Sequence, residues 1–149
     1  MKIDSASPKQ TEKIAAQIGR NLHGGEIIEL ISDLGGGKTT FVRGLARGAS
    51  SSSQVSSPTF KIRNDYQAPK FTIYHFDFFR LSEPGLITGE LDEIIGDKKS
   101  VIIIEWAEIV QAVLPKERLT IKFSSTGEQT RNLEFACPKA LNYLLDGLK

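Results

Sequence analysis

Short apolar runs alternate along this chain with segments whose apolar residues return at helical spacing. A helix is predicted to begin at Ser7, where a capping serine precedes a proline and a glutamine that completes a capping box. Its apolar stripe consists of Ile14, Ile18 and Leu22, and the two glycines at 24–25 are expected to end it. The first helix is therefore predicted to serve packing rather than chemistry.

Unbroken apolar runs predict the interior strands of a sheet. Residues 26–31 form the first run, and residues 101–104 are all β-branched, which is typical of parallel strands covered on both faces. Residues 71–78 place mostly apolar side chains on both faces of an extended chain, which again predicts an interior strand. Three strands of this kind indicate a sheet with helices on both sides.

Shorter patterns predict the remaining elements. Phe60 and Ile62 alternate with two basic residues, which predicts a strand with one wet face and then a turn over residues 64–70. Residues 84–97 contain a short amphipathic helix with a solvated acidic face. Alternating residues at 119–123 and 133–135 predict an antiparallel hairpin. The apolar stripe at residues 138–148 predicts a C-terminal helix that docks on the sheet.

The stretch between the first apolar strand and the next helix is rich in glycine and ends in Gly37-Lys38-Thr39. A strand, a glycine-rich turn and Gly-Lys-Thr at a helix start form a phosphate-binding loop (P-loop), in which backbone N–H groups and the helix N-terminus cradle phosphate. The pattern G-x-x-x-x-G-K-[ST] has Ser32 in place of its first glycine. We predict an α/β, P-loop NTPase-like three-layer fold with a mixed parallel/antiparallel sheet.

Two acidic residues end predicted strands and complete the candidate site. Asp77 closes the strand at 71–78, where a carboxylate is costly to bury unless it is paired or faces a metal. Glu105 follows the β-branched run, at the strand tip where nucleotide-binding folds place an acidic group near Mg²⁺. Trp106 either packs in the core or contacts the nucleotide, and its acidic neighbour favours the second. His75 is expected to be a hydrogen-bonded core histidine.

Composition excludes several classes of protein. The net charge of +1 gives no global field that would attract nucleic acid or a membrane surface. Cys137 is the only cysteine, so an intrachain disulfide is impossible and a cysteine-based metal site is unsupported. The N-terminus lacks the apolar core of a signal peptide, and no run approaches the roughly 18 apolar residues of a membrane span. We expect a cytoplasmic protein without membrane association, in which residues 1–149 form a single P-loop domain.

Four motifs, in order along the chain, resemble those of the TsaE family: residues 34–41 at the P-loop, Ser57–Phe60, His75–Leu81 and Glu105-Trp106. The two middle motifs are more specific than the P-loop alone, and the resemblance covers nearly the whole chain. This family is the bacterial ATPase of tRNA threonylcarbamoyladenosine biosynthesis. The sequence departs from the family pattern at Ser32, at Phe79, where tyrosine is common, and at Ala107, where proline is frequent.

The resemblance implies an ATPase domain over residues 1–149 that uses ATP and Mg²⁺ and works with partner proteins of the TsaB and TsaD type. Hydrolysis is expected to be weak without these partners and to reset the threonylcarbamoyl transferase, with tRNA contacted mainly through the complex. Lys38, Asp77 and Glu105 are the expected catalytic residues, and Mg²⁺ is expected at Thr39, Asp77 and Glu105. The nucleotide is expected to contact Asp33, Leu34, Gly35, Gly36, Gly37, Lys38, Thr39, Thr40, Thr59 and Trp106.

Other functions stay open from the sequence alone. A small-molecule P-loop kinase needs an acceptor pocket and usually an arginine-bearing lid, and the sequence shows no arginine-rich insertion. A nucleotide-dependent binding module, in which Asp77 and Glu105 only tune affinity, is a second rival that the sequence does not exclude. Direct RNA binding by Lys61, Arg63 and Lys70 is a weaker hypothesis than a solvated strand face.

Overall fold

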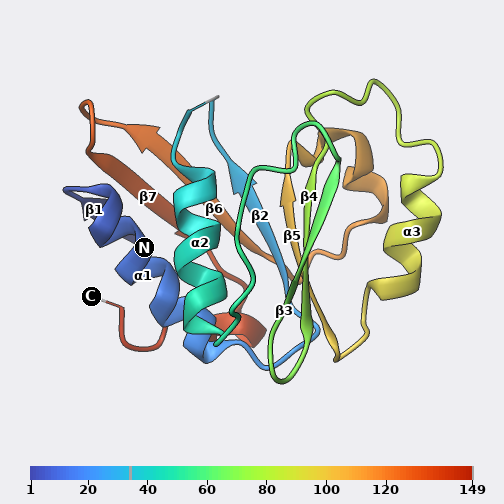
Figure 1. Cartoon of the computed structure of the whole chain (residues 1–149), viewed down its shortest axis with the longest axis horizontal. Helices are drawn as coiled ribbons and strands as arrows, with labels where there is room; N and C mark the ends of the chain where they lie inside the picture. The colour runs from blue at the N-terminus through green and yellow to red at the C-terminus, as the bar shows by residue number, and fades with distance from the viewer. Residues whose placement is uncertain (34, 149) are drawn as a thin grey trace.

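A mixed β-sheet forms the centre of the protein in the computed structural model, which describes residues 1–33 and 35–148 (Figure 1). Its strands are β1 (Lys2–Ser5), β2 (Ile27–Ile31), β3 (Arg63–Gln67), β4 (Thr72–Asp77), β5 (Ser100–Glu105), β6 (Leu119–Ser125) and β7 (Arg131–Ala136). They lie in the order β1-β7-β6-β2-β5-β4-β3. The four middle strands run parallel, whereas β3, β7 and β1 pair antiparallel at the two edges.

Helices cover both faces of this sheet and complete three layers. They are the α-helices α1 (Pro8–Asn21), α2 (Lys38–Gly48) and α3 (Ile87–Ile94) and the 3₁₀ helices η1 (Ala107–Val113) and η2 (Lys139–Leu145). The α1, α2 and η2 helices share one apolar core with the sheet, while α3 and η1 share a second core on the opposite face (Figure 1). The predicted α/β three-layer fold with a mixed sheet is therefore confirmed.

Strand β5 lies between β2 and β4, and all six of its residues are buried. The three strands run parallel, with Leu30 and Asp77 each in register with Glu105. Their carboxyl ends therefore meet at one edge of the sheet, which is where open α/β folds bind ligands. The β-branched run correctly predicted a strand buried on both faces, and its direction places Glu105 at this edge.

Helix α2 is held against α1 by direct contact between their backbones. A Cβ atom added at Gly44 would lie 2.3 Å from the carbonyl oxygen of Glu12, and one at Gly48 would lie 2.0 Å from that of Ala16. Only glycine permits so close an approach.

The predicted cap of α1 is also present, because the Gln10 N–H donates to Ser7 Oγ at 3.1 Å. The Gln10 side chain accepts from the Ala6 N–H, one residue before the expected partner.

The predicted strand at Phe60–Ile62 is wrong. The N–H groups of Lys61 and Ile62 both donate to the Pro58 carbonyl, so the chain turns there, and Ile62 adopts φ +72°. The strand instead begins at Arg63 and continues to Gln67, through residues 64–67 of the predicted turn, because Arg63 to Gln67 pair with β4. An alternation of four residues was too short to distinguish a turn from a strand.

The two ends of the chain also differ from expectation. Strand β1 was not predicted, and it pairs with the distant β7. The C-terminal helix is a short 3₁₀ helix that ends at Leu145, so Leu148 lies beyond it. Its buried residue Leu144 joins the core shared with α1. Among the described residues, no helix has the length and apolar character that crossing a membrane requires.

Candidate functional site

The P-loop connects β2 to α2, and its conformation requires glycine at more than one position. Gly35 and Gly37 have φ angles of +76° and +95°, and Gly37 caps the N-terminus of α2. A Cβ atom at Gly36 would lie 2.2 Å from Ser32 Oγ, so the serine that replaces the first motif glycine fills this space itself. The Ser32 hydroxyl donates to the Asp33 carbonyl at 2.7 Å. Leu34, a predicted nucleotide contact, lies outside the described residues.

Lys38 projects from the first residue of α2 into the interior and is only 6% exposed. Its Nζ atom lies 3.6 Å from Glu105 Oε1 and 3.4 Å from the Ser32 carbonyl oxygen. The same ammonium group lies 4.6 Å from the centre of the Trp106 ring, a cation–π distance. A cation held this way is removed from bulk water, which strengthens its attraction to any anion that reaches the site.

Glu105 is fixed by a hydrogen-bonded chain that crosses the sheet from β5 to β3. Its Oε2 lies 2.5 Å from His75 Nε2, and His75 Nδ1 lies 3.1 Å from the Tyr66 hydroxyl. Tyr66 donates its proton to the Ser56 carbonyl at 2.9 Å, so its oxygen accepts from His75. Burial raises the pKa of Tyr66 above its ordinary value, so the hydroxyl keeps its proton over a wider range of alkaline pH. His75 is thus the predicted hydrogen-bonded core histidine, but it also orients Glu105, which the sequence did not indicate.

Asp77 ends β4 beside Glu105, and it is 3% exposed. Its Oδ2 accepts a hydrogen bond from the Thr59 hydroxyl at 2.7 Å, and its Oδ1 accepts from the Phe79 N–H at 2.9 Å. The Thr59 hydroxyl also lies 2.8 Å from the Ser57 hydroxyl. The predicted Ser57–Phe60 motif is therefore attached to the acidic end of β4, although 18 residues separate Thr59 from Asp77.

A cavity of about 290 Å³ brings these groups together. It is lined by the P-loop and the start of α2, by the Ser57–Thr59 turn and by the strand ends, at Gly35, Gly36, Gly37, Lys38, Thr39, Thr40, Ser57, Thr59, Asp77, Glu105 and Trp106. Of the predicted site residues that the structure describes, all line this cavity except Asp33. The backbone of Trp106 is left-handed, at φ 57°, a conformation that costs energy in residues other than glycine.

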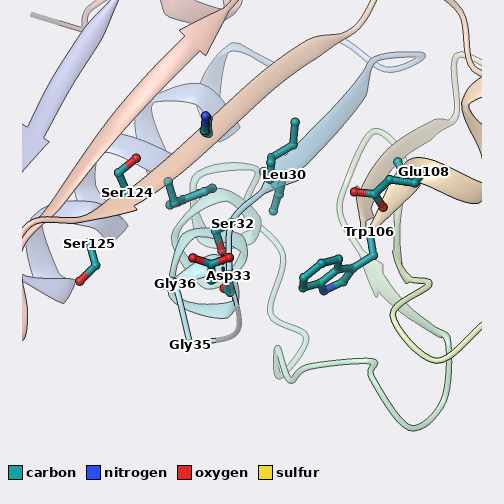
Figure 2. Close-up of a pocket in the computed structure, with 13 residues that line it drawn as sticks. Leu30, Ser32, Asp33, Gly35, Gly36, Trp106, Glu108, Ser124 and Ser125 are labelled. Carbon is teal, nitrogen blue, oxygen red and sulfur yellow. Dashed lines mark hydrogen bonds between the residues drawn. The ribbon is translucent and has the colours of Figure 1, made fainter.

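A second cavity of about 690 Å³ adjoins the first and shares Gly35, Gly36 and Trp106 with it. Asp33 lines this cavity, as do the strand β6 residues Ser124 and Ser125. Figure 2 shows the Trp106 indole on one side of the P-loop and the two serines on the other. Together, the residues that line the two cavities extend from the polar strand ends, along the P-loop, to the hairpin.

The residues of the smaller cavity are suited to Mg²⁺ rather than to a transition metal. Among residues 1–33 and 35–148, no group of three or more His, Cys, Asp or Glu residues is placed to hold a metal ion. The smaller cavity offers the Thr39 hydroxyl and the carboxylates of Asp77 and Glu105. Mg²⁺ prefers such oxygen ligands and usually completes its shell with waters and substrate phosphates. The donor set therefore fits the predicted ion.

Two arginines have roles that the sequence did not reveal. Arg131, at the start of β7, donates from Nε to the Gly36 carbonyl of the P-loop at 3.2 Å. No motif surrounds it, and 95 residues separate the two partners.

Arg63 forms ion pairs with Asp65 and Glu90, and its guanidinium lies over the Tyr74 ring. Those contacts engage Arg63 within the protein, which weakens the hypothesis of an RNA-binding patch around it.

Comparisons with known proteins agree with one another. A family model described as "Threonylcarbamoyl adenosine biosynthesis protein TsaE" matches residues 5–133. A tRNA threonylcarbamoyladenosine biosynthesis protein TsaE from Bacillus subtilis is 34% identical over 135 residues, which cover 91% of this chain and 84% of that protein. The protein of the same name from Treponema pallidum is 33% identical over 138 residues, covering 91% of this chain and 100% of that protein.

The fold points to the same relatives. The crystal structure of Bacillus subtilis YdiB matches with a TM-score of 0.79 and 30% sequence identity, covering 97% of this chain and 90% of that one. The sequence motifs, the family model and the structure thus agree over most of the chain. This chain belongs to the TsaE family.

Proposed function

We propose that this protein binds and hydrolyses ATP with Mg²⁺ and that this activity serves tRNA threonylcarbamoyladenosine biosynthesis. The observation that carries the proposal is the buried ammonium group of Lys38, 3.6 Å from Glu105, in the cavity formed by the P-loop and Asp77. Phosphoryl transfer depends on charge neutralisation and on placing the attacking water, and this cavity contains groups for both tasks. The biosynthetic role is supported by the shared name of the relatives.

Each side chain has a distinct role in this proposal. Lys38 and the N-terminus of α2 stabilise the negative charge of the β- and γ-phosphates. Thr39 and Asp77 hold Mg²⁺, which when bound neutralises phosphate charge, and Asp77 does so directly or through a water. Glu105 orients the attacking water or a metal-bound one, and His75 keeps the Glu105 carboxylate in position. Thr59 responds to the γ-phosphate because its hydroxyl already contacts Asp77.

The two adjoining cavities support a nucleotide as the ligand. The smaller one contains the cation and the acids that polyphosphate with Mg²⁺ requires, and the larger one includes the apolar side chains of Leu30, Ile31 and Phe123 in its lining. A ligand with a charged and a planar half matches this division. Trp106 lines both cavities, so its fluorescence is expected to change when a nucleotide binds.

We further propose that hydrolysis is slow in the isolated protein and is stimulated by partners of the TsaB and TsaD type, in the cytoplasm. The described residues that line the smaller cavity include no arginine, so a transition-state contact of the arginine-finger type has to come from elsewhere. Contact with tRNA would then occur mainly through the complex. Arg80, which lies over the exposed Phe60 ring, is placed to connect the Thr59 segment to a partner.

Calorimetry with Mg-ADP, followed by hydrolysis assays with and without the two partners, tests the proposal. Lys38→Ala should weaken Mg-ADP binding by about 100-fold, because it removes the buried ammonium group that makes a charge-assisted contact to the β-phosphate, which ADP retains. Arg47→Ala, which deletes an exposed arginine of the same helix, is the matched control and should bind normally. Absence of Mg-ADP binding by the wild type would overturn the proposal.

The same assays separate the competing functions. Equal, fast turnover with and without partners would contradict partner stimulation, and a phosphorylated metabolite would indicate a kinase. Retained tRNA modification by a variant that binds ATP without hydrolysing it would indicate a nucleotide-dependent binding module.

A further inference from the structure

The guanidinium group of Arg131 joins the P-loop to the β6–β7 hairpin. On the P-loop side it donates from Nε to the Gly36 carbonyl at 3.2 Å and from Nη2 to the Gly35 carbonyl at 3.5 Å. On the hairpin side its Nη1 donates to the carbonyls of Gly127, Glu128 and Thr130, at 3.1, 3.3 and 2.8 Å. One side chain therefore holds two segments that the sequence separates by more than ninety residues.

The P-loop needs an external restraint of this kind. Gly35, Gly36 and Gly37 are consecutive, and glycine has the largest choice of backbone conformations. None of the three has a side chain that packing could fix. The Gly36 N–H donates to the Asp33 carbonyl at 3.2 Å, and the Gly37 carbonyl accepts from the Phe41 N–H at 3.0 Å, so it is the peptide between Gly36 and Gly37 that depends on Arg131.

The bond from Arg131 to Gly36 also sets the direction of the next N–H group. In a trans peptide the C=O and N–H point to opposite sides, so a carbonyl held by Arg131 directs the Gly37 N–H away from the arginine. Gly37 lines the 290 Å³ cavity, whereas Arg131 does not. The arginine thus favours an N–H donor, rather than a carbonyl oxygen, on the side where phosphate binds.

We propose that Arg131 is a positioning residue of the nucleotide site, which fixes the plane of the Gly36–Gly37 peptide so that the Gly37 N–H receives the polyphosphate. The inference rests on the proposed nucleotide-binding function. Arg131 need not touch the ligand, because it acts through the backbone on the opposite side of the loop. Two features of arginine matter here: several donors in one plane, which reach both segments, and a permanent charge, which strengthens bonds to carbonyls.

Arg131→Ala, Arg131→Lys and the control Arg47→Ala test this role, with Mg-ADP as the ligand. Arg131→Ala should raise the Mg-ADP dissociation constant about 10-fold, the effect expected from losing a charge-assisted hydrogen bond that holds the loop. Arg131→Lys keeps the charge but supplies a single donor group, so it should restore the melting temperature more fully than the affinity. Arg47→Ala, an exposed arginine paired with Glu12, should change neither quantity.

Amide hydrogen exchange without nucleotide gives a second, independent measurement. The peptide that contains Gly35–Gly37 should exchange faster in Arg131→Ala than in the wild type or in Arg47→Ala. Unchanged affinity and unchanged exchange in Arg131→Ala would overturn the inference while leaving the proposed function intact. Wild-type protein that does not bind Mg-ADP would instead overturn the proposed function, and the exchange measurement would still decide whether Arg131 restrains the loop.

Discussion

Glu26 and Glu105 are both 3% exposed and both flank apolar strands, yet their surroundings differ completely. Glu26 precedes β2, where its carboxylate accepts from the N–H groups of His23 and Gly24 at 2.6 and 2.7 Å and from the Tyr143 hydroxyl at 2.7 Å. Glu105 ends β5, where it contacts the side chains of Lys38 and His75 and lines a cavity. Only the second glutamate is placed to meet a ligand.

Strand direction explains the difference. Glu26 lies at the amino end of a parallel strand, and Glu105 lies at the carboxyl end, where ligands bind in such sheets. The partners differ as well, because Glu26 is held largely by backbone N–H groups that cannot change their role, whereas Glu105 is held by side chains. A buried acid beside an apolar run therefore indicates function only when the direction of the strand is known.

The largest effect is expected from Glu105→Gln. Glutamine retains the shape, and neutral His75 can accept from its amide while still donating to Tyr66, so the fold should persist. Partner-stimulated ATP hydrolysis should fall by about 100-fold or more, as on removal of a catalytic acid–base group. Steady-state hydrolysis measured beside Mg-ADP calorimetry checks both parts. Near-normal turnover would remove Glu105 from the proposed chemistry.

Glu26→Gln should have the opposite outcome, a loss of stability with turnover retained. A glutamine amide has one oxygen that accepts and one NH₂ group that donates. At least one of the groups that donate to Glu26, which are the N–H groups of His23 and Gly24 and the hydroxyl of Tyr143, would therefore face another donor. We expect a loss of about 2 kcal/mol in the free energy of unfolding, with turnover unchanged well below the melting temperature. Urea denaturation measures the first quantity. A stable but inactive variant would show that the two acids are not functionally distinct.

Asp77→Asn should have a smaller and more specific effect than Glu105→Gln. The asparagine can still accept from the Phe79 N–H, but it loses the charge that would attract Mg²⁺. The Mg²⁺ concentration needed for half-maximal hydrolysis should rise about 10-fold, while ADP binding without Mg²⁺ stays the same. A magnesium titration at saturating ATP checks this, and an unchanged requirement would place the ion elsewhere.

Tyr143→Phe should have the smallest effect and should depend on pH. Burial, reinforced by Glu26, raises the pKa of Tyr143 above that of an unfolded tyrosine, which is about 10. The unfolded chain therefore releases this proton first, so the stability that the hydroxyl contributes is complete below about pH 10 and declines above it. The variant should lose about 1 kcal/mol at neutral pH and show a shallower alkaline decline in urea denaturation. Parallel pH curves for both proteins would contradict this.

The sequence predicted the parts of the fold and site that depend on local pattern. The β-branched run at 101–104 specified β5, and the Gly-Lys-Thr sequence placed Lys38 at a helix start, both as observed. Asp77 and Glu105 were found because each carboxylate ends a predicted interior strand, and the structure places the two in register. Their predicted catalytic and metal-binding roles stay predictions until they are tested.

Contacts between distant segments were not predictable in this way. Strand β1 is four residues long and forms by pairing with β7, more than 120 residues later. Arg131 reaches the P-loop from a hairpin that contains no recognised motif, and His75 reaches Glu105 across neighbouring strands. Such contacts follow from the sheet order, which a single sequence does not specify. The mistaken strand at Phe60–Ile62 has the opposite cause, because local turn hydrogen bonds to Pro58 overrode a weak alternation.

The contact of α1 with α2 at Gly44 and Gly48 limits how the protein could signal the state of the proposed nucleotide. Two helices whose main chains already touch cannot slide or rotate past each other without collision, so they act as a rigid frame behind the P-loop. Displacement on hydrolysis would then fall on the front of the site, in the segment from Ser57 to Ile62. That segment presents Phe60, which is 83% exposed, to any protein that reads the outcome.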